Sequence, residues 1–153
     1  MKSRYLSGLL GVCIISAVAT KAQEPVPVKQ QTPEKPYIFS QLPDRSICSS
    51  AELLELFRTN SSTSIAIHLS GGKLLRGVIT EKIERSPGIT SINIKLSDYP
   101  GALFNLSSYT QPGQSPVIKG RIIHPQAGDV LVLSLENDQY LLQKKAQKFF
   151  MTE

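Results

Sequence analysis

Few residues in this chain are of the types that carry nucleophilic or metal chemistry. The chain has two cysteines, Cys13 and Cys48, and two histidines, His68 and His124. A thiol nucleophile needs a histidine base and an orienting group, and a tetrahedral zinc site needs cysteine and histidine at close spacing. The histidines lie far apart, one in a strand-like run and the other beside a proline in a turn. We therefore expect no catalytic residue, no metal site and no cofactor.

Two groups of carboxylates are spaced closely enough for acid and base roles. Glu81 and Glu84 lie near the end of an expected strand, and Glu136 and Asp138 flank an expected turn, where acidic residues are common for conformational reasons. We interpret both groups as surface charge and predict that the protein is not an enzyme. The alternative is a small secreted hydrolase or thiol enzyme that uses Cys48 or the acids near Glu81.

Two tyrosines are the best candidates for contacts with a partner. Tyr99 and Tyr109 flank the same short expected strand, and both lie near turn residues. A tyrosine combines a large apolar ring with a polar hydroxyl, which suits it to binding surfaces. We predict that these two residues bind, and we interpret most of the other aromatic residues as core or edge packing.

The first 22 residues have the pattern of a secretory signal peptide. Lys2 and Arg4 give a positive start, residues 6–19 form an apolar run, and Ala22 supplies the small residue before a cleavage site. The run is shorter than the about 20 residues that a membrane-spanning helix needs. We expect an exported protein that is periplasmic, cell-surface or extracellular, with no integral membrane segment after processing.

Removal of this leader changes how the charge is interpreted. Of 17 basic and 12 acidic residues, Lys2, Arg4 and Lys21 are lost with the leader, which leaves a net charge of +2. A value so close to zero gives no electrostatic footprint for nucleic acid. Cys48 is then the remaining cysteine, and we expect it to be buried beside an apolar helix. Pairing with another chain and a reactive thiol are the alternatives.

Residues 23–43 form a predicted proline-rich, disordered linker. The segment contains Pro25, Pro27, Pro33, Pro36 and Pro43 among glutamine, lysine and glutamate, and these residue types bury little apolar area. It is either a spacer that holds the domain away from a membrane or partner, or an ordinary disordered N-terminus. Residues 37–39 are an apolar island within it, and we expect them to form an edge strand or a docking patch.

The domain is expected to span residues 44–153 and to contain one short helix at 49–58. Ser49 and Glu52 have the spacing of a capping box before an apolar run. Most of the apolar residues then fall on one side of the helix: Leu53, Leu54, Leu56 and Phe57. Ten residues are too few for a stable isolated helix. We expect this helix to pack across an open end of the strands that follow it.

After residue 59, apolar residues recur every second position in short runs separated by turn residues. Strands are predicted at 64–69, 73–83, 90–96, 103–106, 117–123, 130–135 and 139–144, and Phe149 and Phe150 either add a strand or pack across the barrel end. The connections are too short for parallel crossovers. Gly77 and Gly120 lie in mid-strand, where a curved sheet bends. We therefore predict an all-β fold, a small antiparallel six- to seven-stranded barrel, with a β-sandwich as the alternative.

One hairpin carries a local resemblance. Residues 65–73, Ile-Ala-Ile-His-Leu-Ser-Gly-Gly-Lys, are followed by Gly77-Val78-Ile79. This stretch resembles the first hairpin of Sm-like barrels, in which a strand, a glycine turn and a bent second strand recur. The resemblance covers about 15 residues and implies a small barrel. The RNA-binding residues of that family have no counterparts at positions of this chain, so no function is carried over.

These observations favour a binding protein over an enzyme. We expect an exported, non-catalytic β-module that binds a protein, a glycan or another component of the cell envelope. The enzyme alternative requires a site assembled from scattered residues. A structural subunit of the envelope is a further alternative, since it shares every sequence feature with the binding module.

Overall fold

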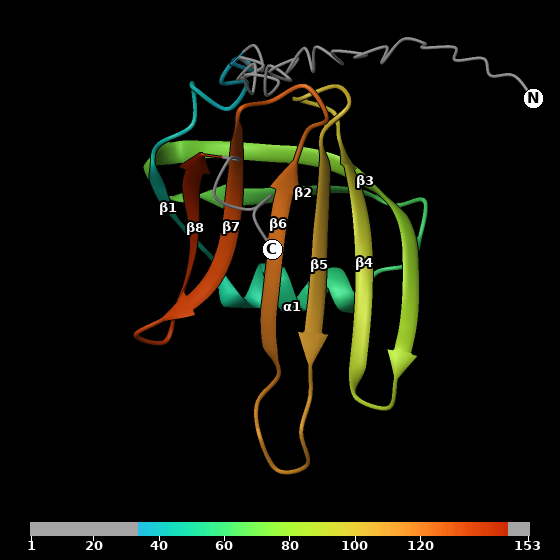
Figure 1. The fold of residues 1–153 in the computed structure, drawn as a ribbon. Helices are drawn as coiled ribbons and strands as arrows, with labels where there is room; N and C mark the ends of the chain where they lie inside the picture. The colour runs from blue at the N-terminus through green and yellow to red at the C-terminus, as the bar shows by residue number, and fades with distance from the viewer. Residues whose placement is uncertain (1–33, 147–153) are drawn as a thin grey trace, which may run out of the picture. The chain divides into compact units, whose positions relative to one another are not determined.

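A computed structural model of the chain describes residues 34–146. Within them, eight antiparallel strands form one closed barrel in which neighbours in the chain pair and the first strand closes on the last (Figure 1). The strands are β1 (Arg45–Cys48), β2 (Ser64–Leu69), β3 (Lys73–Ser86), β4 (Ile89–Leu96), β5 (Leu103–Tyr109), β6 (Val117–Ile123), β7 (Asp129–Glu136) and β8 (Gln139–Ala146). The predicted all-β antiparallel barrel is confirmed and the sandwich alternative is wrong.

The strand count is eight, whereas the sequence predicted six or seven. The strand without a counterpart in the prediction is β1, which has only four residues and begins with a charged one. It pairs along its whole length with β8 but shares a single residue pair, Cys48 with Leu69, with β2. A strand this short has too few alternating positions to be recognised from periodicity.

Alternation along the strands decides which side chains fill the barrel. In β4, Ile92, Ile94 and Leu96 are buried, while Asn93 and Lys95 between them face outward. The other strands contribute a similar interior of aliphatic side chains and Phe104. An eight-stranded barrel is just wide enough to be filled by its own side chains.

The predicted helix is confirmed as α1 (Ser50–Arg58), and it lies at one end of the barrel in Figure 1. The Ser49 hydroxyl accepts a hydrogen bond from the Glu52 N–H at 3.4 Å, as expected for an N-cap. Leu53 and Leu56 are buried against the core. The Glu52 carboxylate accepts the backbone N–H of His68 at 2.8 Å, which ties the helix to β2.

A turn that precedes β1 packs against the core. Residues 38–41 form this turn, which replaces the edge strand that was one of the two expectations for residues 37–39. Phe39 and Leu42 are buried in the core. The Asp129 carboxylate, at the start of β7, accepts the backbone N–H groups of Ile38 and Phe39, both at 3.0 Å. We call residues 36–42 the N-terminal strap.

Gly77 and Gly120 are required for close approach between strands. A Cβ at Gly77 would lie 2.6 Å from the Lys95 carbonyl oxygen, and one at Gly120 would lie 2.5 Å from Leu106 Cδ2. The pairing of β3 with β4 shifts register further along the strand, between Ile79 and Glu81 and between Glu84 and Ser86. Any larger residue at either glycine would push neighbouring strands apart.

Several sequence predictions fall outside the described residues. The signal peptide at 1–22, most of the linker and the pair Phe149 and Phe150 are among them. Within residues 34–146, no helix has both the length and the apolar character needed to cross a membrane.

Candidate functional site

The two predicted binding tyrosines are placed at opposite ends of β5. Tyr99 precedes this strand and Tyr109 is its last residue, so about 20 Å of strand separates them. Tyr99 is half-buried, and its ring packs edge-on against Phe39 with ring centroids 5.3 Å apart. Burial, followed by the charges of Asp98 and Asp129, raises the pKa of Tyr99. The structure therefore gives Tyr99 a packing role and does not bring the two tyrosines together.

Tyr109 remains accessible, with 41% of its surface exposed. It lies in register between Ile89 of β4 and Val117 of β6, both half-buried, so its ring is part of an apolar row across three strands. The Thr110 N–H donates to the Gly88 carbonyl at 2.7 Å and ties the two adjoining loops together. The backbone at Tyr109 is therefore fixed by pairing with strands on both sides and by the hydrogen bond of the next residue.

Next to this row, the outward side chains of the same strands are small and polar. The hydroxyls of Ser91 and Ser107 lie 2.9 Å apart in a hydrogen bond. In the following row, the Asn105 amide donates to the Asn93 carbonyl oxygen, and the Asn93 amide donates to Glu81 on β3. These four serine and asparagine side chains are half-buried and hold one another in place.

The same surface carries three exposed cations, and the carboxylate of Glu81 on β3 borders it through the hydrogen bond from Asn93. Strands β4, β5 and β6 contain no aspartate or glutamate, and their outward residues include Lys95, Lys119 and Arg121. All three are exposed, and none of them forms an ion pair with any residue in the range 34–146. We call the outward side chains of these strands the β4–β6 face. It comprises Ile89, Ser91, Asn93, Lys95, Leu103, Asn105, Ser107, Tyr109, Val117, Lys119, Arg121 and Ile123.

Arg76, on β3, is already engaged by an acid. Arg76 binds the Asp98 carboxylate through Nη2 at 2.9 Å and Nε at 3.1 Å, and its backbone N–H donates to the same group at 2.8 Å. The side-chain hydrogen bond from Arg76 is the main cause that lowers the pKa of Asp98. This ion pair borders a shallow groove of about 590 Å³ that also includes Ser64 and Ser97. The Asp98 carboxylate offsets the charge of this guanidinium, so the pair attracts an anionic ligand less than a cation without a partner does.

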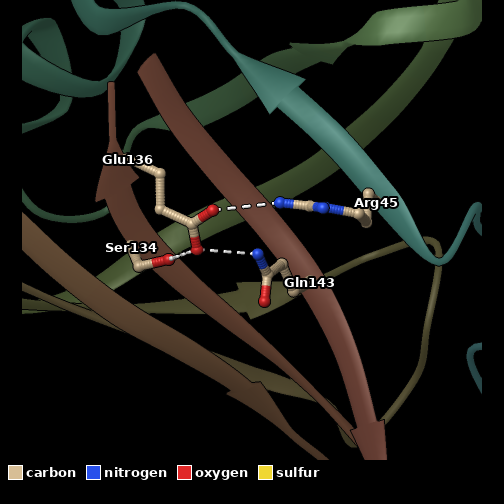
Figure 2. Close-up of polar contacts among 4 residues, drawn as sticks. All are labelled: Arg45, Ser134, Glu136 and Gln143. Atoms are coloured by element: carbon tan, nitrogen blue, oxygen red, sulfur yellow. Dashed lines mark hydrogen bonds and ion pairs between the residues drawn. The ribbon is translucent and has the colours of Figure 1, made fainter. Parts of the chain in front are cut away.

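Glu136, one of the candidate carboxylates, accepts hydrogen bonds from three side chains. Figure 2 shows the carboxylate of Glu136, on β7, facing both Arg45 of β1 and Gln143 of β8. Its oxygens accept from Arg45 at 3.0 Å, from Gln143 at 2.8 Å and from Ser134 at 3.3 Å. Asp138 lies in the following turn with a positive φ of 61°, a conformation that aspartate tolerates. Both acids therefore have structural explanations, and Glu136 ties β1 to β7 across β8.

The histidines are placed on different parts of the barrel and engage different partners. His68 Nδ1 lies 2.9 Å from the Glu52 carboxylate, and the His68 ring is exposed. His124 Nε2 lies 3.1 Å from the carbonyl oxygen of Pro100. In the part of the chain that the structure describes, no three histidine, cysteine or acidic side chains gather in a way that could hold a metal ion.

Cys48 is buried, as the sequence predicted, with 3% of its surface exposed. Burial, with a smaller effect of the Glu52 charge, raises the pKa of its thiol to about 12. A nucleophilic cysteine needs a lowered pKa. The thiol is therefore protonated near neutral pH and unsuited to that role.

Sequence reasoning missed the charged and amide residues of the β4–β6 face. The alternation in residues 117–123 already places Lys119 and Arg121 on one side of a strand. Their position beside Asn105 and Ser107 depends on the register between β5 and β6. That register is a tertiary property. The sequence therefore showed that Lys119 and Arg121 share one side of a strand, but not which residues of the next strand lie beside them.

No protein-family model matches the chain, and comparisons with curated proteins and with solved structures gave no significant match.

Proposed function

We propose that the protein is an exported, non-catalytic β-module that binds a protein, a glycan or another cell-envelope component through its β4–β6 face. The observation that carries this proposal is the combination, on one face, of the exposed Tyr109 with two preorganised polar rows and three cations that form no ion pair within the described residues. Binding surfaces need polar groups that are fixed before the ligand arrives, because ordering them on binding costs free energy.

The state of the candidate reactive groups supports a non-catalytic role. The Cys48 thiol has a raised pKa, and the Glu136 carboxylate is engaged by three donors. General acid or base catalysis requires a group that can reach a substrate and exchange a proton near the working pH. The buried, protonated Cys48 thiol does not meet that requirement, and the Glu136 carboxylate is held in place by hydrogen bonds from β1, β7 and β8.

The leader residues support export, and this part of the proposal has a direct test. The purified protein from an exporting host should begin at Gln23 in intact-mass or N-terminal sequencing, which corresponds to cleavage after Ala22. A product that starts at Thr20, after Ala19, leaves the proposal intact because the leader is still removed. A mature protein that retains Met1 or Lys2 would contradict export by a cleaved leader.

Binding is tested by affinity capture with two matched tyrosine variants. Immobilised protein is incubated with the envelope fraction of the host, including its soluble glycans, and bound material is quantified. Tyr109→Ala should lose most of the captured partner, because the substitution removes the exposed ring from the face. Tyr37→Ala removes a tyrosine that is 60% exposed and lies before the barrel, and it should capture as much as the unmodified protein.

Equal capture by the unmodified protein and Tyr109→Ala would contradict the assignment of binding to this face. Thermal melts of both variants check that each remains folded, since substitutions at exposed positions usually change stability by less than about 0.5 kcal/mol.

A further inference from the structure

We infer that the β4–β6 face binds a carboxylated polysaccharide, an inference that rests on the proposed binding function and specifies its ligand. The first argument is charge. Lys95, Lys119 and Arg121 are exposed and lack ion-pair partners within residues 34–146. The three strands that carry them contain no acid, so the face has an excess of positive charge even with Glu81 of β3 at its border. Such a face attracts an anion, and potentials that complement each other steer association and select partners.

The placement of the cations favours a polymer with repeated charges over a single small anion. Lys119 and Arg121 are two residues apart on one side of β6, a spacing of about 7 Å. Lys95 lies on β4, beyond β5, so about 10 Å of sheet width separates it from β6. One carboxylate cannot contact all three groups, whereas successive carboxylates along an extended chain can.

The groups between the cations match the hydroxyls of a sugar. The hydroxyls of Ser91 and Ser107 and the amides of Asn93 and Asn105 form two hydrogen-bonded rows across the middle of the face. Hydroxyl and amide groups can both donate and accept, as sugar hydroxyls do. Because these side chains are already half-buried and paired, they lose little conformational freedom on binding.

The apolar row at the end of the face supplies a surface for the C–H side of a sugar ring. Tyr109 is exposed there, and Ile89 and Val117 lie beside it in register. A tyrosine ring can bury apolar area against a sugar while its hydroxyl still forms a hydrogen bond. A partner with both ring C–H groups and hydroxyls, such as a polysaccharide, uses the apolar row and the polar rows together.

Two other polyanions fit the face less well. The cores of protein interfaces are depleted in lysine and serine, whereas Ser91, Ser107 and Lys119 form one of the middle rows of this face. Single-stranded nucleic acid is bound by stacking successive bases on several aromatic residues. On the β4–β6 face, Tyr109 is the aromatic residue available for stacking.

The test uses the full purified protein and polygalacturonate, a defined carboxylated polysaccharide, in fluorescence anisotropy at low and physiological salt. Fully methyl-esterified polygalacturonate has the same sugar backbone without the negative charges, and dextran is neutral. The protein should bind polygalacturonate, more weakly as salt rises because exposed charges are screened. It should bind the methyl ester and dextran at least about tenfold more weakly, the loss that corresponds to removing one charge-assisted hydrogen bond.

A pair of double variants locates the site. Lys119→Gln/Arg121→Gln should weaken polygalacturonate binding by about tenfold or more, and Tyr109→Ala should weaken it as well. Lys73→Gln/Lys145→Gln removes the same net charge from exposed positions on β3 and β8, and it should bind like the unmodified protein. Equal losses in the two double variants would show attraction by net charge alone and would overturn the inference.

Three further results would overturn it while leaving the proposed function standing. One is absence of polygalacturonate binding although envelope capture still depends on Tyr109. The others are equal or tighter binding of polyglutamate, which would indicate an acidic protein, and equal or tighter binding of single-stranded DNA. If capture is independent of Tyr109 and polygalacturonate also fails to bind, the proposed function falls together with the inference.

Discussion

Asp129 is predicted to hold the N-terminal strap on the barrel, and Asp129→Ala should be strongly destabilising. The Asp129 side chain is buried, with 1% of the residue exposed. Its two oxygens accept the N–H groups of Ile38 and Phe39, each at 3.0 Å. Phe39 is itself fully buried, so the loss of the carboxylate leaves backbone donors of the strap without a partner in the interior.

The magnitude follows from these two hydrogen bonds. A hydrogen bond to a charged acceptor contributes about 1.5–3 kcal/mol to stability, so the loss of two such bonds in Asp129→Ala should lower the free energy of unfolding by about 3–6 kcal/mol. Asp129→Asn keeps the shape and one acceptor oxygen, and we expect about half of that loss. A typical domain has a total stability of about 5–15 kcal/mol, which makes the alanine effect easy to measure. Glu84→Ala, at an exposed position, is the control and should change stability by less than about 0.5 kcal/mol.

The assay is urea unfolding of a double-mutant cycle with Phe39→Ala. Truncation of a buried phenylalanine costs about 3–5 kcal/mol by itself. If Asp129 acts by keeping Phe39 in the core, Phe39→Ala should cost clearly less when Asp129 is already alanine. Full additivity of the two substitutions, or a loss of less than about 1 kcal/mol in Asp129→Ala, would refute the reasoning.

Three further predictions concern single residues. Burial raises the pKa of Cys48 to about 12, so iodoacetamide should label the native thiol slowly near neutral pH and rapidly after denaturation; fast native labelling would contradict this. Gly120→Ala would place a Cβ 2.5 Å from Leu106 Cδ2 and should destabilise by about 1–3 kcal/mol in thermal melts, whereas an unchanged melting temperature would show that the strands can separate freely. The Arg76 hydrogen bond lowers the pKa of Asp98. The stability that this ion pair gives the folded protein is therefore complete above the ordinary carboxyl pKa and is lost as the pH falls through the lowered pKa. The difference in melting temperature between the unmodified protein and Asp98→Asn should therefore vanish in acid, and a difference that grows there would be inconsistent with the ion pair.

Local patterns in the sequence were sufficient for most of the fold. Strict alternation in residues 90–96 predicted β4, and the capping spacing of Ser49 and Glu52 predicted α1. Both signals depend only on neighbours in the chain. The strap was different. Its anchor, Asp129, lies about 90 residues further along the chain, and nothing near residues 36–42 indicates that partner.

The candidate site was predictable only in part for the same reason. Tyr109 was identified from its position at the end of a strand, and it is exposed in the structure. Tyr99 has the same local pattern, yet it packs on Phe39 of the strap. The prediction that both tyrosines bind remains open, but alanine at Tyr99 is now expected to destabilise the fold, so binding is better tested through Tyr109 alone.

Both ends of the barrel are covered, and this favours its outer wall as the place where a partner binds. An eight-stranded barrel can enclose a small ligand when its interior is left partly empty. Here Phe39 and Leu42 of the strap, together with Leu53 and Leu56 of α1, are buried in the same core cluster as the inward strand residues. Entry of a ligand would require the strap or the helix to leave the core, at the cost of exposing those side chains. The β4–β6 face requires no such rearrangement, since its polar rows and cations are already presented on paired strands.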